Sequence, residues 1–459
     1  MKIGITNSSS RIDFTFIPED GDTPILDRPF NMDRAKCYVE LPSGVTQKGI
    51  HPDLLGLAVI LMVYPFFSSI TLPFGVSKQF GETFKKKFQK DIGPIDTQLV
   101  PRKSRLHSAP ALAFSGGMDS SAALAIMPKT TKSFFLNTPI SMRSYYLNQA
   151  ALAACASIKD RGYFAEVVET DLEFLRNPVG FAVDYSNCVP AVLLADRENL
   201  DSIAFGMTQG AAYSISRGAF VDLVDREFHM RWMELFKIVD LPINLVTAGI
   251  SEVGTMIIAH ESGFDSFAQS CVQGVTDHPC NKCWKCFRKR LCEQAVQKTD
   301  IDIDELSTFF HAREISEGLK EIPIRQESIF TYATASYDGA SPVMQALKRR
   351  VRGDSMSIDW MRKWYPHSIE LIVPKYRDEI REVIMRYLEE MDERDIEDMK
   401  GWDLLKAVET PEYRKNCEQL SCLLEGESPD RRVPEIVCRG ARKMKHAARV
   451  VSSRLFGYM

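Results

Sequence analysis

Short apolar runs alternate with helical patterns in the middle of the chain. The apolar runs are bounded by polar or turn-forming residues, as buried strands are, and they cover residues 109–114, 133–136, 164–168 and 202–205. The segments between them repeat apolar positions at helical spacing, at residues 120–127, 142–159 and 188–198. Strands and helices in this alternation build βαβ units, so we predict an α/β fold with a parallel sheet. Ligands of such sheets bind at the carboxyl ends of the strands.

The pattern changes on both sides of this core. On the amino-terminal side, strand-like runs at residues 12–17, 37–41 and 70–74 accompany helical patterns at residues 52–64 and 79–89, the second capped by Ser77. From residue 301 helical patterns predominate, at residues 356–364, 374–391 and 402–408. We therefore predict an α+β segment over residues 1–105, the α/β core over residues 106–300, and a mainly helical region over residues 301–459.

Composition narrows the class of protein. The 459 residues carry 57 Lys+Arg against 61 Asp+Glu, and this balance excludes a globally basic nucleic-acid-binding protein. The apolar stretch at residues 54–70 is interrupted by Pro65, and the first residues lack the apolar core of a secretory signal. We therefore expect a cytoplasmic protein without membrane contact, whose 11 cysteines are thiols or metal ligands rather than disulfides.

A glycine loop, defined here as residues 115–121, follows the first predicted strand of the core and leads into a helix. It consists of Ser115, Gly116, Gly117, Met118, Asp119, Ser120 and Ser121. Glycines let the backbone approach an anion closely, and the amino terminus of the helix points free N–H groups at it. The serine hydroxyls add donors. Asp119 would repel a bare phosphate, so its presence predicts Mg²⁺ between the carboxylate and phosphate oxygens.

A cysteine cluster lies further along the core. Cys271, Cys280, Cys283 and Cys286 are spaced C-x8-C-x2-C-x2-C. Four thiolates at short spacing are typical of a closed tetrahedral zinc site, in which the metal clamps a loop. Soft sulfur ligands also suit an iron–sulfur cluster, which stays an alternative. His278 and Cys292 lie nearby, and either could stand in for one ligand.

The glycine loop resembles the pyrophosphate-binding loop of the PP-loop ATP pyrophosphatases. Followed by the cysteine cluster, it is similar to the 7-cyano-7-deazaguanine synthase branch of that superfamily. The segment at residues 242–246 leading into residues 249–254, and Arg288 just after the last cysteine, add to this resemblance. It covers about residues 106–295, whereas residues 142–148 and 207–213 differ from the substrate segments of that branch.

The resemblance implies a fold, a reaction and cofactors. The fold is an adenine nucleotide alpha hydrolase-like core, and the cofactors are ATP, Mg²⁺ and Zn²⁺. The reaction is that of a ligase that cleaves ATP to AMP and pyrophosphate. Adenylation of a carboxylate or carbonyl oxygen prepares it for attack by a nitrogen nucleophile, and a 7-deazaguanine-like carboxylate is one candidate substrate. Ser115, Asp119 and Ser120 are the implied catalytic residues, and the whole glycine loop binds the pyrophosphate.

Two other functions stay open. The same chemistry could modify a nucleic acid or protein acceptor, as in tRNA modification or a defence system, through the carboxyl-terminal extension. Its tail is basic, with Arg431, Arg432, Arg439, Arg442, Lys443, Lys445, Arg449 and Arg454. Alternatively, the chain could bind nucleotide without turnover as a partner protein. A homodimer is also considered.

Overall fold

The computed structural model describes residues 1–8, 10–23, 30–142 and 146–426. Contacts between Cα atoms group the chain into two compact units, which are described separately. The first unit comprises residues 1–209, 231–280 and 362–391, and the second comprises residues 210–230, 281–361 and those from 392 onward. The division into three sequence segments stays a prediction.

The first unit contains two five-stranded sheets. The first sheet is mixed and has the order β4-β2-β1-β5-β6, with β1 Lys2–Ser8, β2 Arg11–Ile17, β4 Lys36–Glu40, β5 Ser69–Ser77 and β6 Asp91–Asp96. Strands β1 and β2 pair antiparallel, as do β2 and β4, whereas β5 runs parallel to both β1 and β6. The short strands β3 Asn31–Met32 and β10 Arg176–Asn177 pair with each other. The predicted strands at residues 12–17, 37–41 and 70–74 are all present.

The second sheet is parallel throughout, which confirms the predicted α/β architecture. Its order is β12-β11-β7-β8-β9, with β7 Ala109–Ala113, β8 Lys132–Asn137, β9 Phe164–Glu169, β11 Leu200–Phe205 and β12 Ile243–Asn244. From β7 the chain adds β8 and β9 on one side, and then crosses over to add β11 and β12 on the other. The order of the strands therefore reverses between β7 and β11, and ligands of open parallel sheets bind at the carboxyl ends of such a pair.

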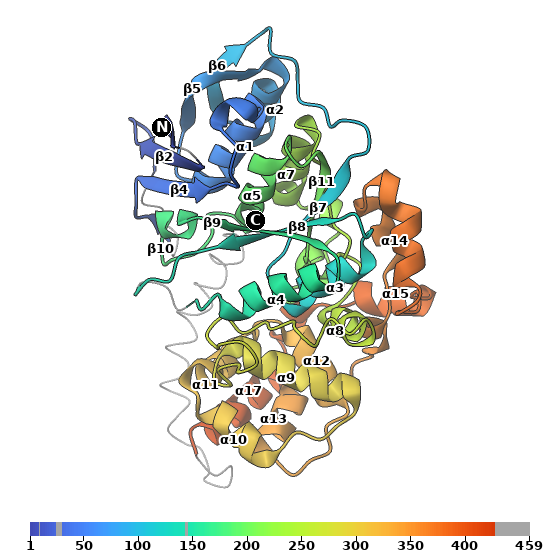
Figure 1. The fold of residues 1–459 in the computed structure, drawn as a ribbon. Helices are drawn as coiled ribbons and strands as arrows, with labels where there is room; N and C mark the ends of the chain where they lie inside the picture. The colour runs from blue at the N-terminus through green and yellow to red at the C-terminus, as the bar shows by residue number, and fades with distance from the viewer. Residues whose placement is uncertain (9, 24–29, 143–145, 427–459) are drawn as a thin grey trace. The chain divides into compact units, whose positions relative to one another are not determined.

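Helices cover both faces of the second sheet, as a doubly wound fold requires. Figure 1 shows α3, α4 and α8 below the sheet and α5 above it. Helices α3 and α8 also pack against each other. The helices of this unit are α1 Pro52–Val63, α2 Lys78–Phe88, α3 Met118–Ile126, α4 Gln149–Asp160, α5 Val189–Leu194, α7 Glu227–Ile238 from Arg231 onward, α8 Glu252–Glu261 and α14 Arg377–Ile384.

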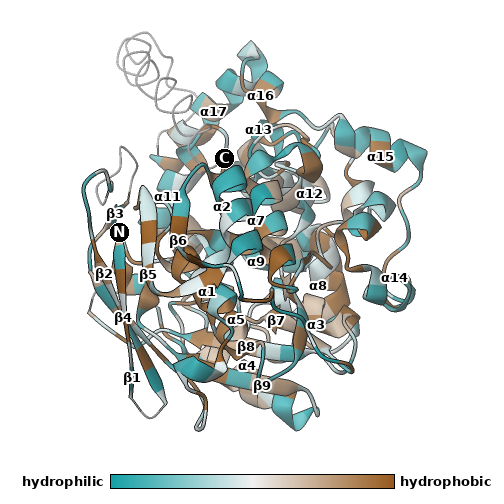
Figure 2. Cartoon of the chain, turned by 90° about the horizontal axis from the view of Figure 1, so that it is seen from above, coloured by the Kyte–Doolittle hydropathy of each residue, from teal (hydrophilic) through white to brown (hydrophobic). Residues whose placement is uncertain are grey.

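The two sheets of the first unit are joined by a buried helix and by a strand edge. Helix α1 packs on both β5 and α5, and Figure 2 shows its apolar colouring beside the hydrophilic α2. The Ser77 hydroxyl accepts from Phe80 N at 3.2 Å, so the predicted cap of α2 is confirmed. At the edge of the second sheet, Val39 of β4 forms a bridge with Thr170, just beyond β9. The Tyr38 hydroxyl also donates to Glu169 at 2.8 Å.

Several predicted helices are wrong in length or kind. The patterns at residues 188–198 and 402–408 yield only the shorter helices α5 Val189–Leu194 and α16 Leu404–Ala407. The pattern at residues 142–159 yields only α4, and Asn148, the residue before that helix, donates its side-chain amide to Asn137 Oδ1 at the end of β8 at 2.8 Å. Residues 356–364 form a 3₁₀ turn, Asp359–Arg362. Trp364 is extended and donates its backbone N–H to Glu389 O at 2.8 Å, and this pairing also explains why α14 ends before residue 391.

The second unit is helical, as predicted for the carboxyl-terminal region. Its helices are α9 Trp284–Gln297, α10 Ile303–His311, α11 Arg313–Lys320, α12 Glu327–Ala335, α13 Pro342–Arg350, α15 Glu393–Lys400, α16 Leu404–Ala407 and α17 Pro411–Leu424. The short helix α6 spans Gln209–Ala212. The 3₁₀ helices of the chain are Gln47–Gly49, Leu172–Leu175, Asp184–Cys188, Leu223–Asp225, Asp359–Arg362, Pro366–Leu371 and Pro374–Tyr376. The predicted basic tail lies outside the described residues.

None of the helices in the described residues is both long enough and apolar enough to cross a bilayer. The apolar run at residues 54–70 is divided between α1 and the start of β5, and the apolar side chains of α1 are buried.

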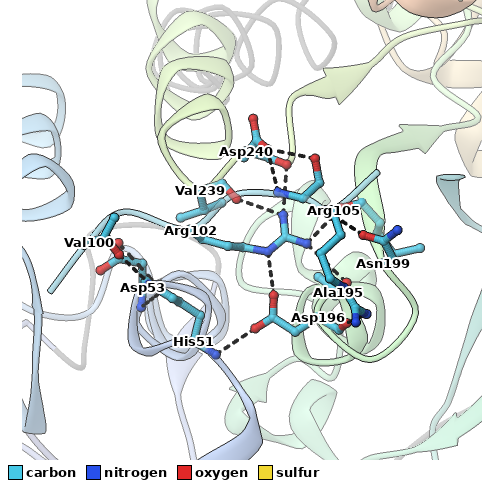
Figure 3. Close-up of polar contacts among 12 residues, drawn as sticks. His51, Asp53, Val100, Arg102, Arg105, Ala195, Asp196, Asn199, Val239 and Asp240 are labelled. Atoms are coloured by element: carbon cyan, nitrogen blue, oxygen red, sulfur yellow. Dashed lines mark hydrogen bonds and ion pairs between the residues drawn. The ribbon is translucent and has the colours of Figure 1, made fainter. Parts of the chain in front are cut away.

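A buried arginine in the segment before β7 fixes the start of the second sheet (Figure 3). Arg102 is 3% exposed. Its guanidinium donates over 2.8–3.2 Å to Asp196 Oδ1 and to the carbonyl oxygens of Ala195, Leu200, Val239 and Asp240. The other Asp196 oxygen accepts from His51 N at 2.9 Å, at the amino terminus of α1. One ion pair therefore ties α1, α5, β11 and the residues after α7 to the segment that enters β7.

Replacement of Arg102 should destabilise the chain much more than replacement of its neighbour Arg105. Arg102→Ala leaves four carbonyl groups, three of them buried, and Asp196 Oδ1 without this donor, so we expect a loss of about 3–5 kcal/mol. Arg105 is exposed and donates only to Asp196 O and through its backbone to Asn199, so Arg105→Ala should cost less than about 1 kcal/mol. Urea unfolding of the two variants measures the difference. Equal losses would contradict the role assigned to Arg102.

Candidate functional site

The glycine loop lies where the order of the second sheet reverses. Strand β7 ends at Ala113, Phe114 N donates to Phe134 O of the neighbouring strand at 3.0 Å, and α3 begins at Met118. Gly117 is the N-cap residue in an extended conformation, and no side chain of its own caps the helix. The predicted sequence of strand, glycine loop and helix is therefore present, at the carboxyl end of a central strand where ligands of parallel sheets bind.

Gly116 has a backbone conformation and surroundings that only glycine satisfies. Its φ is +71°, and a Cβ atom at this position would lie 2.8 Å from the Cα atom of Ala151 in α4. Its carbonyl oxygen accepts from Gln269 N at 3.0 Å. The loop thus turns tightly between α4 and residue 269, so its main-chain groups are held in one conformation.

The serines of the loop form a local hydrogen-bond network. The Ser120 hydroxyl lies 3.0 Å from the Ser115 hydroxyl, accepts from Ser115 N at 3.2 Å and donates to Gly117 O at 3.0 Å. Ser115 itself is exposed at the end of the strand. Ser121 is fully buried, and its hydroxyl has no hydrogen-bond partner among the described residues. A buried hydroxyl without a partner is costly, and this oxygen is closed off from solvent inside α3.

Asp119 is held by a residue that the sequence did not indicate. The Thr255 hydroxyl, which is fully buried in the first turns of α8, donates to Asp119 Oδ1 at 2.7 Å. The same hydroxyl lies 3.1 Å from Glu252 O, one turn earlier in the helix. Because α3 and α8 pack together, a threonine far along the chain orients the carboxylate that the sequence predicts to bind Mg²⁺. Only the packing of α3 against α8 brings them together, so no local sequence signal could have revealed the pair.

The backbone after β11 lies close to the start of α3. A Cβ atom on Gly206 would lie 2.9 Å from Ser120 N and 3.0 Å from the carbonyl carbon of Asp119. The backbone after β11 therefore touches the first turn of α3 directly. Gly206 stands directly after a predicted strand, and a glycine at such a position is a sequence signal for close approach of another backbone segment.

A methyl group at Gly206 should disturb α3. We expect Gly206→Ala to destabilise the chain by about 1–3 kcal/mol, because the added atom overlaps backbone that cannot move without shifting the helix. Gly49→Ala is the matched control, since no atom lies within 4 Å of the added Cβ there, and it should change stability by less than about 0.5 kcal/mol. Thermal unfolding of both variants tests this. A Gly206→Ala protein as stable as the control would show that the backbone at Gly206 is not packed closely against the first turn of α3.

A second polar cluster lies at the carboxyl ends of β8 and β9. The Thr138 hydroxyl donates to the buried Glu173 carboxylate. Burial raises the pKa of Glu173, and the Thr138 hydrogen bond opposes that rise. Residues 142–148, which differ from the substrate segment of the 7-cyano-7-deazaguanine synthase branch, follow Thr138 in the chain, and residues 143–145 lie outside the described residues. Cys155 of α4 is no nucleophile, because burial raises the pKa of its thiol to about 12.

The four predicted cysteines gather in one group. The sulfur atoms of Cys271, Cys280, Cys283 and Cys286 all lie within 4.8 Å of one another. Three of these residues are buried and Cys280 is half-buried. Cys283 is the N-cap residue of α9, and its sulfur accepts from Cys286 N at 3.5 Å. Within the described part of the chain, neither His278 nor Cys292 belongs to a group of this kind.

This donor set fits a metal ion. Four sulfur atoms at this separation can converge on one tetrahedral ion with little movement, and soft thiolates favour zinc over harder cations. The ten cysteines of the described residues are all free, so no disulfide competes for these sulfur atoms. Four protein ligands leave no open position, which is the arrangement of a structural site rather than a catalytic one.

The purified chain should therefore contain about one equivalent of zinc and no visible absorbance. Cys283→Ser should lose the metal, because one of four thiolates is replaced by a poor ligand. Cys292→Ala is the matched control and should keep it, since Cys292 is a buried cysteine outside the group. Elemental analysis and the absorption spectrum decide this. Iron with acid-labile sulfide would instead establish the iron–sulfur alternative.

Comparisons with known proteins give one match, which covers less than half of the chain. A family model described as a family of unknown function (DUF6395) matches residues 231–403. The matched range includes Thr255 and the cysteine cluster but not the glycine loop. No curated protein and no solved structure matches the chain.

Proposed function

We propose that this chain is an ATP-dependent ligase of the PP-loop type, which forms AMP and pyrophosphate while it adenylates a carboxylate or carbonyl oxygen for attack by a nitrogen nucleophile. The observation that carries the proposal is the position of the glycine loop at the reversal point of a parallel sheet, with Asp119 oriented by Thr255. The strand order and the tight turn at Gly116 both support an anion-binding role. An adenine nucleotide alpha hydrolase-like core is part of the same proposal.

Each loop residue has a physical part in this reaction. Backbone N–H groups of the loop and the hydroxyls of Ser115, Ser120 and Ser121 would bind the departing pyrophosphate, on which negative charge accumulates. Asp119 would hold Mg²⁺, which neutralises phosphate charge when it is bound. Thr255 keeps the Asp119 carboxylate in one orientation before the nucleotide binds, so less reorganisation is needed during the reaction.

The proposed acceptor is a small carboxylate, with a 7-deazaguanine-like acid as the first compound to test. A carboxylate is a poor electrophile, and AMP on its oxygen turns that oxygen into a good leaving group. The cysteine cluster takes no part in this chemistry, because a closed Zn²⁺ site has no position for substrate. Its proposed role is to hold the loop that carries it.

Product analysis with ATP, Mg²⁺, ammonium and candidate carboxylates tests the proposal. We expect AMP and pyrophosphate, and we expect Asp119→Asn to lower the rate by about 10²-fold or more, because the metal loses its charged ligand. Thr255→Val should lower it by about tenfold, and Thr255→Ser should restore most of the rate, since only the hydroxyl matters.

Asp160→Asn is the matched control, since Asp160 is an exposed carboxylate at the end of α4, and it should leave the rate unchanged. ADP and phosphate as the only products would overturn the proposal. Nucleotide binding without turnover against every acceptor class, including RNA and protein, would favour a non-catalytic partner protein instead.

A further inference from the structure

Residues 269–271 connect the glycine loop with the cysteine cluster. Gln269 N donates to Gly116 O at 3.0 Å. The next residue, Ser270, accepts from Met118 N at 3.3 Å through its side-chain oxygen. The residue after that is Cys271, the first cysteine of the cluster. Two consecutive residues therefore bind the backbone of the glycine loop, and the third is a metal-ligand candidate.

The Ser270 hydroxyl accepts the hydrogen bond of Met118 N, an amide in the first turn of α3. This amide belongs to the group of N–H donors that an anion at the helix terminus would meet. A hydroxyl that accepts from Met118 N still has its own proton to donate. Ser270 can therefore donate a second hydrogen bond to a bound phosphate oxygen. A Cβ atom added to Gly117 would lie 3.6 Å from the Ser270 hydroxyl oxygen, which is an ordinary van der Waals distance.

The segment is equally well anchored to the loop that carries the cysteines. The Gln269 side-chain amide donates to Cys271 O at 3.3 Å and to Val275 O at 3.1 Å. Cys280 N donates to Cys271 Sγ at 3.3 Å. A Cβ on Gly274 would lie 2.8 Å from Cys280 N, so this loop is closely packed on itself. Movement of Cys271 would therefore be passed to Gln269 and Ser270.

We infer that metal binding at the cysteine cluster is coupled to nucleotide binding at the glycine loop through residues 269–271. Zinc draws four thiolates to about 2.3 Å from one centre, and part of its binding free energy orders the loop that supplies them. An ordered loop holds Ser270 against Met118 and Gln269 against Gly116. The metal thus favours the conformation of the glycine loop that binds phosphate. The nucleotide half of this inference rests on the proposed function.

Linkage makes the inference quantitative. If zinc tightens nucleotide binding by some factor, nucleotide must tighten zinc binding by the same factor. We expect a factor of about ten, within the range common for coupled sites. The probes are Zn²⁺ and the magnesium complex of α,β-methylene-ATP, with the full-length chain stripped of metal by chelation and then refilled. Titration of nucleotide with and without zinc, and of zinc with and without nucleotide, gives both factors.

A metal-dependent readout at the loop separates this inference from the proposed function. Amide hydrogen exchange at Gly117 and Met118 should speed up at least about tenfold when zinc is removed, whether or not nucleotide binds. Circular dichroism confirms that the stripped chain is folded. If the stripped chain is unfolded, the zinc-loaded Ser270→Ala variant is measured in its place. Exchange at Met118 should be faster in this variant, because the acceptor of the Met118 N–H group is gone. Ser266→Ala is the matched control, since this exposed hydroxyl contacts only Gly263 and Arg161.

The outcomes are distinguishable. Faster exchange on zinc removal or in Ser270→Ala, together with equal linkage factors above about five, supports the coupling. Unchanged exchange in a folded, zinc-free chain, or linkage factors near one, overturns it and leaves the proposed function intact. Failure of the zinc-loaded wild-type chain to bind the nucleotide overturns the proposed function, and the exchange measurement then still decides whether the metal orders the loop.

Discussion

The guanidinium of Arg102 determines where the central strand of the second sheet begins. It is buried, and it satisfies four carbonyl groups and one carboxylate from segments that are distant in sequence. One of those carbonyls belongs to Leu200, which pairs with Ala109 at the start of β7 and β11. The register of these two strands sets the relative height of their carboxyl ends. A register shift between Leu200 and Ser202 separates this anchored end from Ile203–Phe205, which pair with Ala111–Ala113 and lead into Gly206.

Sequence reasoning succeeded where local chemistry decides the structure. Alternation of apolar runs and helical patterns predicted the parallel strands, because their buried side chains and bounding turns are local features. The glycine loop and the cysteine spacing could be recognised for the same reason. The positive φ of Gly116 favours glycine, which is visible in the sequence. The four cysteines of the cluster lie close together along the chain, so their spacing is visible there too.

Sequence reasoning failed where distant segments decide the structure. Thr255 and Ser270 look ordinary in the sequence, and only the packing of α3, α8 and residue 270 brings their hydroxyls to the glycine loop. The aromatic and apolar residues near Trp364 suggested a helix, although the backbone there pairs with Glu389 instead. Helix α4 is shorter than its pattern, and the asparagine side chain just before it bonds to the end of β8. Hydrophobic periodicity reports burial, but it does not report which partner a backbone group finds.

The junction between Val39 and Thr170 bears on how copies of this chain could associate. A parallel sheet with an open outer strand offers unpaired N–H and C=O groups to any other extended chain. At the carboxyl end of β9 the first sheet covers this edge: Val39 forms a backbone bridge with Thr170, and the side chains of Thr170 and Asp171 bond to Tyr38 O and Tyr38 N. Strand addition is therefore blocked at that end of the sheet, and self-association by edge pairing there would first require the two sheets to separate.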